Sequence, residues 1–114
     1  MAAKVGKSGC AVESALSVIG GRWKGVLLFW LLKEGCLRFG ELRRLLPNCT
    51  PRMLTLQLRE LETHGLVKRT VYAEVPPRVE YEPTAFGRSL EPVILGLREW
   101  GEKYHRRLAA AAAE

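Results

Sequence analysis

The sequence predicts a mainly α-helical domain that carries a small three-stranded antiparallel sheet. Apolar residues recur at helical spacing up to about residue 64, and two alternating runs follow. Glycine or proline stands at most of the expected boundaries. The 114 residues suit one domain. We expect a flexible N-terminal arm at residues 1–9, the folded domain at 10–108 and a tail at 109–114.

Two helices are expected in the first third of the chain. The first runs over about 9–19, with Ser8 as a candidate cap, and the glycine pair at 20–21 breaks it. The second runs over about 23–34. Gly35 is a natural C-terminal cap for it, because glycine readily takes the left-handed conformation that ends many helices.

A second pair of helices is predicted over 39–46 and 50–64, with a turn at 47–49 that begins with proline. The start of the second of these helices is the clearest in the chain. Thr50 is a good N-cap, and Pro51 fits the first helical position, where its missing N–H would have no partner anyway.

The 50–64 helix is amphipathic. Its predicted buried face repeats at helical spacing through Leu54, Leu58 and Leu61. The opposite face holds Arg52, Leu56, Arg59 and Thr63. A basic, outward-facing helix that is supported by a neighbouring helix fits the major groove of DNA.

The alternating runs at 67–72 and 78–82, joined by a loop at 73–77, are typical of a β-hairpin. Two strands alone are marginally stable, so we expect the short extended segment at 37–38 to pair with them. Two helices, a tight turn and a hairpin beside them make a winged helix-turn-helix.

A last helical region is expected from Thr84 to about Leu108, and Pro92 is expected to split or kink it near Leu90. It carries an apolar stripe that a monomer would struggle to cover. Together with two residues of the first helix, we assign this stripe to a dimer interface: Val12, Leu16, Leu97, Trp100, Tyr104 and Leu108. A twofold dimer would place two recognition helices about 34–36 Å apart, one turn of DNA.

The net charge is +6, from 18 lysines and arginines against 12 acids, and the pI is about 9.6. This balance favours a polyanionic partner, although a plain basic surface would give the same numbers. The longest apolar run, at 26–32, is far below the roughly 20 residues that span a bilayer. With no signal-peptide pattern at the N-terminus, we expect a cytoplasmic protein without a membrane segment.

Enzyme functions are not expected, and we predict no catalytic residues and no cofactor. The chain has two histidines, His64 and His105, and lacks a phosphate-binding glycine loop or a nucleophile–histidine–acid pattern. Glu60 and Glu62 face different sides of their helix. The cysteines are odd in number and lack metal-ligand spacing, so we predict neither a disulfide framework nor a metal site.

The predicted DNA contacts come from three segments. Arg52 lies in the first turn of the recognition helix, where it could reach guanine or phosphate, and Arg59 is expected on the DNA backbone. Arg78 is the best candidate on the wing, whereas Glu74 near the tip disfavours a tip in the minor groove. The alternative is an ordinary solvated face. The full set is Arg43, Arg44, Thr50, Pro51, Arg52, Thr55, Leu56, Arg59, Lys68, Arg69 and Arg78.

From Cys10 to about Gly101 the chain resembles the HxlR-type winged-helix transcriptional regulators, relatives of the MarR group. The resemblance lies in an ordered set of short motifs: CAVE (10–13), IGGRWK (19–24), RFGEL (38–42), PRMLT (51–55), LRELE (58–62), GLV (65–67), PPRVEY (76–81) and GRSL (87–90). It implies a homodimeric transcription factor that reads DNA with its third and fourth helices.

The chain departs from the family pattern at two positions. Ala11 replaces a usual proline at a helix start. Leu56 replaces a polar residue, often glutamine, on the outward face of the recognition helix. A leucine cannot hydrogen-bond a base edge, but it can contact a thymine methyl group.

Cys10 and Cys49 are candidates for redox sensing. Cys10 lies near a helix N-terminus with Lys7 close by, and both features lower a thiol pKa. Some relatives of the family sense oxidants or aldehydes through an N-terminal cysteine at the matching position. Cys49, in the turn before the recognition helix, would be the most consequential partner. The alternative for Cys10 is a small buried hydrophobic residue.

We therefore predict a dimeric regulator that binds a near-palindromic operator on double-stranded DNA, with an oxidant or a small molecule as a possible signal. Two alternatives stay open. One is a winged-helix module that binds protein rather than DNA. The other is a sensor with a ligand pocket between the dimer helix and the winged core. For Trp23, Phe29, Trp30 and Trp100, packing in the core or the dimer is favoured over an aromatic cage.

Overall fold

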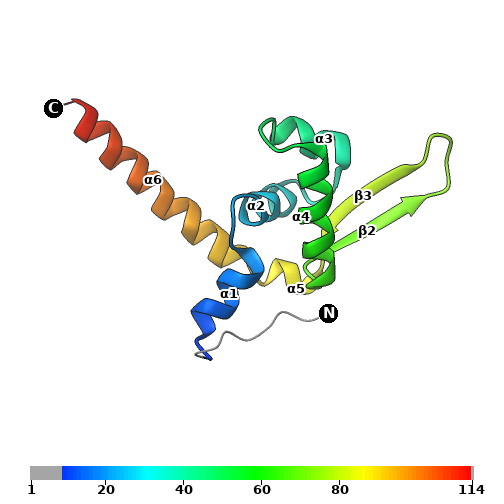
Figure 1. Cartoon of the computed structure of the whole chain (residues 1–114), viewed down its shortest axis with the longest axis horizontal. Helices are drawn as coiled ribbons and strands as arrows, with labels where there is room; N and C mark the ends of the chain where they lie inside the picture. Colours follow the sequence, from blue (N-terminus) through cyan, green and yellow to red (C-terminus); the bar gives the residue numbers. More distant parts are fainter. Residues whose placement is uncertain (1–8, 114) are drawn as a thin grey trace.

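The computed structural model describes residues 9–113 and confirms the predicted fold class (Figure 1). Within these residues, six helices form the helical core and its long extension, and one short strand pairs with the two longer strands that form the wing. In chain order the elements are α1 (Ala11–Ile19), α2 (Lys24–Glu34), β1 (Leu37–Arg38), α3 (Phe39–Leu45), α4 (Pro51–Thr63), β2 (Val67–Tyr72), β3 (Arg78–Pro83), α5 (Ala85–Arg88) and α6 (Glu91–Ala113).

The sheet is antiparallel with the strand order β1-β3-β2, so the predicted pairing of the 37–38 segment with the hairpin is confirmed. Leu37 lies opposite Tyr81, and both side chains are buried. Beyond this point β2 and β3 extend away from the helices as a two-stranded wing (Figure 1). The wing is thus anchored to the core at its base only.

The core is built mainly from leucines of α2 and α4. Leu27, Leu28 and Leu31 of α2 are fully buried, and the predicted inner face of α4 is buried as well. Burying one such side chain contributes roughly 1.5–3 kcal/mol, so this cluster fixes α4 against α2. The arrangement leaves the opposite face of α4 in solvent.

Two of the predicted boundaries differ from the structure, and one is confirmed. The first helix begins at Ala11, with Cys10 at the N-cap, and the proposed cap Ser8 lies outside the described residues. The predicted split of the last helical region near Leu90 is confirmed: α5 ends at Arg88 and α6 begins at Glu91, with Pro92 in its first turn. The tail expected at 109–114 was wrong for 109–113, which continue α6 to Ala113, since alanine is the strongest helix former.

No single described helix is long and apolar enough to cross a bilayer. Helices α1 and α2 meet that length and hydrophobicity only when taken together, and they are bent by 75° at the break between them.

The N-cap of α4 should contribute measurably to stability. The Thr50 Oγ1 accepts a hydrogen bond from the Met53 backbone N–H at 3.1 Å. Thr50→Ala removes this acceptor, so we expect the free energy of unfolding to fall by about 1 kcal/mol and the melting temperature by about 4 °C. Thermal denaturation followed by circular dichroism measures the change. Thr50→Ser keeps the acceptor and should melt within about a degree of the parent; equal losses in both variants would contradict the role of the cap.

Candidate nucleic-acid interface

The outward face of α4 is arranged as predicted. Arg52, Leu56, Arg59 and Thr63 are all exposed, and 49% of Leu56 is accessible. Within residues 9–113, neither Arg52 nor Arg59 forms an ion pair with a carboxylate. The two cations of this face are therefore available to an external anion.

The polar groups at the start of α4 are partly engaged within the helix. The half-buried Thr55 donates its Oγ1 hydrogen to the Pro51 carbonyl at 3.0 Å, and the Thr50 hydroxyl oxygen caps the helix. The Thr55 oxygen can still accept a hydrogen bond, and Pro51 is exposed beside it. The face that carries Arg52 thus begins, at the N-terminal end of α4, with Thr50, Pro51 and Thr55.

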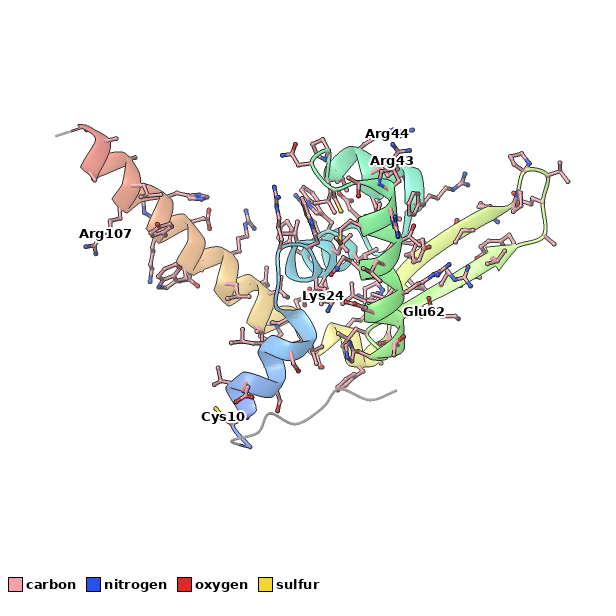
Figure 2. The ribbon with its side chains drawn as sticks, in the orientation of Figure 1. Cys10, Lys24, Arg43, Arg44, Glu62 and Arg107 are labelled. Atoms are coloured by element: carbon pink, nitrogen blue, oxygen red, sulfur yellow. The ribbon has the colours of Figure 1, made fainter. Side chains whose placement is uncertain are left out.

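Arg43 and Arg44 of α3 point into solvent above the start of α4 (Figure 2). Together with Gly40 and Pro47 they line a shallow hollow of about 390 Å³. The predicted outward position of both arginines is confirmed. Their placement at the end of α3 puts positive charge beside the N-terminus of α4, where backbone N–H groups also favour phosphate.

Two ion pairs that the sequence analysis missed hold α4 in place. The Lys24 Nζ lies 2.6 Å from the Glu60 carboxylate, with only 13% of the Lys24 side chain exposed, and joins α2 to α4. The Glu62 carboxylate lies 3.7 Å from the Arg69 Nε and joins α4 to β2. Lys24 and Glu62 are labelled in Figure 2. Both acids are therefore paired with cations other than Arg52 and Arg59.

A hollow of about 450 Å³ separates α4 from the base of the wing, lined by Arg59, Glu62, Thr63 and Arg69. Arg69 and Lys68 are exposed, as expected of strand residues near DNA, but the Arg69 charge is shared with Glu62. Lys68 has no ion-pair partner among the described residues. The hollow brings Arg59 of the recognition helix and Arg69 of the wing to one surface.

Arg78, predicted as the main cation of the wing, is held within it. Its guanidinium lies 3.3 Å from the Glu74 carboxylate and 3.1 Å from the Glu80 carboxylate. It also lies over the Tyr72 ring, 3.9 Å from the centroid. Glu74 is therefore paired with a guanidinium that it shares with Glu80, so its charge is a weaker obstacle to DNA than the sequence suggested. Val75 next to it is fully exposed at the tip.

The two candidate redox cysteines differ in accessibility. Cys10 is exposed at the N-cap of α1, and hydrogen bonding from the backbone at Glu13 and then Val12 lowers the pKa of its thiol. The alternative that Cys10 is a buried hydrophobic residue is therefore wrong. Cys49 is buried, and burial raises its thiol pKa, although the charge of Arg22 opposes that rise. Within one chain, Cys10 and the α3–α4 turn lie at opposite sides of the molecule (Figure 2).

The stripe assigned to the dimer is exposed along α1 and α6, and 64% of Trp100 is accessible. The Trp100 and Tyr104 rings are stacked, with centroids 5.6 Å apart and planes 12° from parallel. Helix α6 extends away from the winged core (Figure 1), and Ile94 is the one residue of its described part that is buried. The exposed stripe is Val12, Leu16, Leu97, Trp100, Tyr104 and Leu108.

The other large aromatic residues pack rather than form a cage. Trp23, Phe29 and Trp30 are partly buried against the core, and the Phe29 and Trp30 rings meet edge to face at 5.2 Å. Among residues 9–113, no three histidine, cysteine or acidic side chains gather in a way that could hold a metal ion. The notable features of the described surface are therefore its exposed arginines and its apolar stripe.

A helix-turn-helix with an uncompensated basic face, braced by a β-wing, defines a class of DNA-binding transcriptional regulators. Comparison with known proteins gives the family. A family model described as HxlR-like helix-turn-helix matches residues 18–109. The chain therefore belongs to the HxlR-like family of transcriptional regulators, in agreement with the resemblance of its motifs.

Individual relatives agree with this assignment. The chain is 59% identical over 100 residues to the uncharacterized HTH-type transcriptional regulator YdeP of Bacillus subtilis, covering 88% of this chain and 77% of YdeP. It is similar to the solved structure of the redox regulator HypR in its oxidized form, with 57% identity, a TM-score of 0.78 and coverage of 82% of this chain and 96% of that one. The structure of HypR in its reduced form is also similar, with 53% identity and a TM-score of 0.83, and the match covers 89% of this chain and 99% of that one. These relatives are regulators rather than enzymes.

Proposed function

We propose that the chain binds a near-palindromic operator as a homodimer, with α4 in the major groove. The observation that carries this proposal is the pair of exposed arginines, Arg52 and Arg59, which keep their charge while neighbouring acids are paired elsewhere. Leu56 lies between them on the same face and would contact a thymine methyl group. Arg43 and Arg44 would position the helix on phosphates.

The apolar stripe on α1 and α6 supports the homodimer. Six exposed apolar and aromatic side chains on α1 and α6 are costly to leave in water, and a second copy of the chain would cover them by twofold symmetry. The expected spacing of the two α4 helices, about 34–36 Å, would match one turn of DNA. The operator would then consist of two half-sites one turn apart.

A salt titration of operator binding tests DNA recognition directly. Each phosphate contact releases counterions, so the logarithm of affinity should fall linearly with the logarithm of salt concentration. With six to ten contacts, affinity should drop by roughly 10³–10⁵ between about 50 and 200 mM salt. Fluorescence anisotropy with the DNA upstream of the protein's own gene measures this. A flat salt dependence would favour the alternative of a winged-helix module that binds protein.

We also propose that oxidation or electrophile modification of Cys10 alters operator affinity. The thiol is exposed, and its lowered pKa raises the share of the reactive thiolate at neutral pH. The similar structures named as oxidized and reduced forms of a redox regulator support the proposal. We expect peroxide or an aldehyde to change operator affinity of the parent and to leave the Cys10→Ser variant much less affected, measured by anisotropy. The same response in Cys10→Ser would refute the role of Cys10.

A further inference from the structure

A cavity of about 370 Å³ lies where the α1–α2 turn, α2 and the first turns of α6 meet. Its volume is within the range of about 300–1,000 Å³ that small-molecule sites occupy. The cavity lies on the side of α2 away from the DNA-reading face of α4. Its lining consists of Ile19, Gly21, Arg22, Gly25, Val26, Phe29, Ile94, Leu97 and Arg98.

The apolar part of the lining is preformed. Ile19 and Ile94 are buried members of the core, and Phe29 packs against that core from α2. Gly25 leaves room beside them: a Cβ built at this position would meet only the Ile19 carbonyl oxygen, at an ordinary contact distance of 3.7 Å. The cavity therefore has a rigid hydrophobic floor.

The charged part of the lining consists of two arginines. Arg22 lies over the Trp23 ring at 4.5 Å from its centroid, and Arg98 lies over the Phe29 ring at 5.5 Å. In residues 9–113 neither guanidinium forms an ion pair with a carboxylate, although four of the other arginine and lysine side chains of the core and wing do. Two cations beside an apolar floor select a ligand with an anionic head and a hydrophobic body.

We propose that this cavity binds a small organic carboxylate, with its hydrophobic body on Phe29 and Ile94 and its carboxylate at Arg22 and Arg98. The chemical class follows from the lining alone and does not depend on DNA binding. A regulatory role for this ligand does rest on the proposed operator binding.

Leu97 gives the cavity a connection to the dimer helix. It lines the cavity and also belongs to the exposed stripe assigned to the dimer. A bound carboxylate would thus contact a residue of the proposed dimer interface, and this contact is the route by which it would affect operator binding.

Octanoate is a suitable probe, with 1-octanol as the uncharged control. Isothermal titration calorimetry on the full-length protein without DNA should detect octanoate and show at least about tenfold weaker binding of 1-octanol. Arg98→Met removes one cation while keeping an unbranched side chain and should weaken octanoate binding by about tenfold. Arg106→Met makes the same change farther along α6, at a residue that lines none of the described cavities, and should bind like the parent.

Gly25→Leu tests the location independently, because a leucine at this position would fill the cavity and should abolish binding. Equal binding of octanoate by the parent and Arg98→Met, or no binding by the parent, would overturn the proposal. Binding only by a monomeric variant would show that a second copy of the chain occupies the cavity, and would overturn it too. Binding without any change in operator affinity would leave the site standing and refute its regulatory role.

Discussion

Replacing Arg52 and Arg59 together by alanine is expected to weaken operator binding roughly 1,000-fold, because a dimer loses four arginine contacts of about 1 kcal/mol each. Both side chains are exposed on the α4 face, and neither supports the core. The slope of the salt titration should become shallower by up to about 4, since each lost phosphate contact removes one set of released counterions. Anisotropy titrations at several salt concentrations give both quantities.

Arg106→Ala is the matched control for charge. Arg106 is exposed on α6, outside the DNA-facing surface, so its loss should change operator affinity by no more than about twofold. If the double variant bound the operator like the parent, α4 would not be the reading helix. If both variants lost affinity equally, net charge rather than the α4 surface would govern binding.

Trp100→Asp is expected to dissociate the proposed homodimer, raising its dissociation constant by at least about 100-fold. Trp100 is exposed in one chain and stacked on Tyr104 at the centre of the stripe, where a buried tryptophan would contribute most to association. The variant places two unpaired carboxylates in an apolar interface. Analytical ultracentrifugation or light scattering over a range of protein concentrations measures the change.

A matched control distinguishes dimerisation from folding. Lys103→Asp alters charge on the same helix without removing an apolar side chain of the stripe, so the dimer should persist. Circular dichroism should show that Trp100→Asp keeps the helices of the winged core, because the Trp100 side chain is exposed and is not part of the buried core. A Trp100→Asp variant that remained a dimer would mean that the stripe is not the interface.

The recognition helix could be predicted from the sequence because its signals are local. The Thr50-Pro51 start, the leucine repeat and the terminating Gly65 all act within one helix, and the structure has them as predicted. The same holds for the hairpin, whose two alternating runs are adjacent in the chain. Local periodicity was therefore enough to predict the recognition helix and the hairpin, and to predict that Arg52 and Arg59 face outward.

Charge pairing between elements could not be predicted in the same way. Nothing in the spacing of Lys24 and Glu60 indicates a contact, because it arises only after α2 and α4 have packed. Arg78 was assigned to DNA because it stands beside the loop, but the folded hairpin brings its guanidinium to Glu80 on the same strand and to Glu74 in the loop. The cavity at Arg22 and Arg98 likewise depends on how α6 crosses α2.

Helix α6 has a consequence for how the protein reaches its folded state. Beyond Ile94, no described residue of α6 is buried against the rest of the chain. The helix therefore has little tertiary support in a single copy of the protein. The second copy would supply that support, and ordering of the helix would then be a bimolecular event. The apparent melting temperature would rise with protein concentration, and the cellular abundance of the regulator would itself set how much of it is competent to occupy its gene.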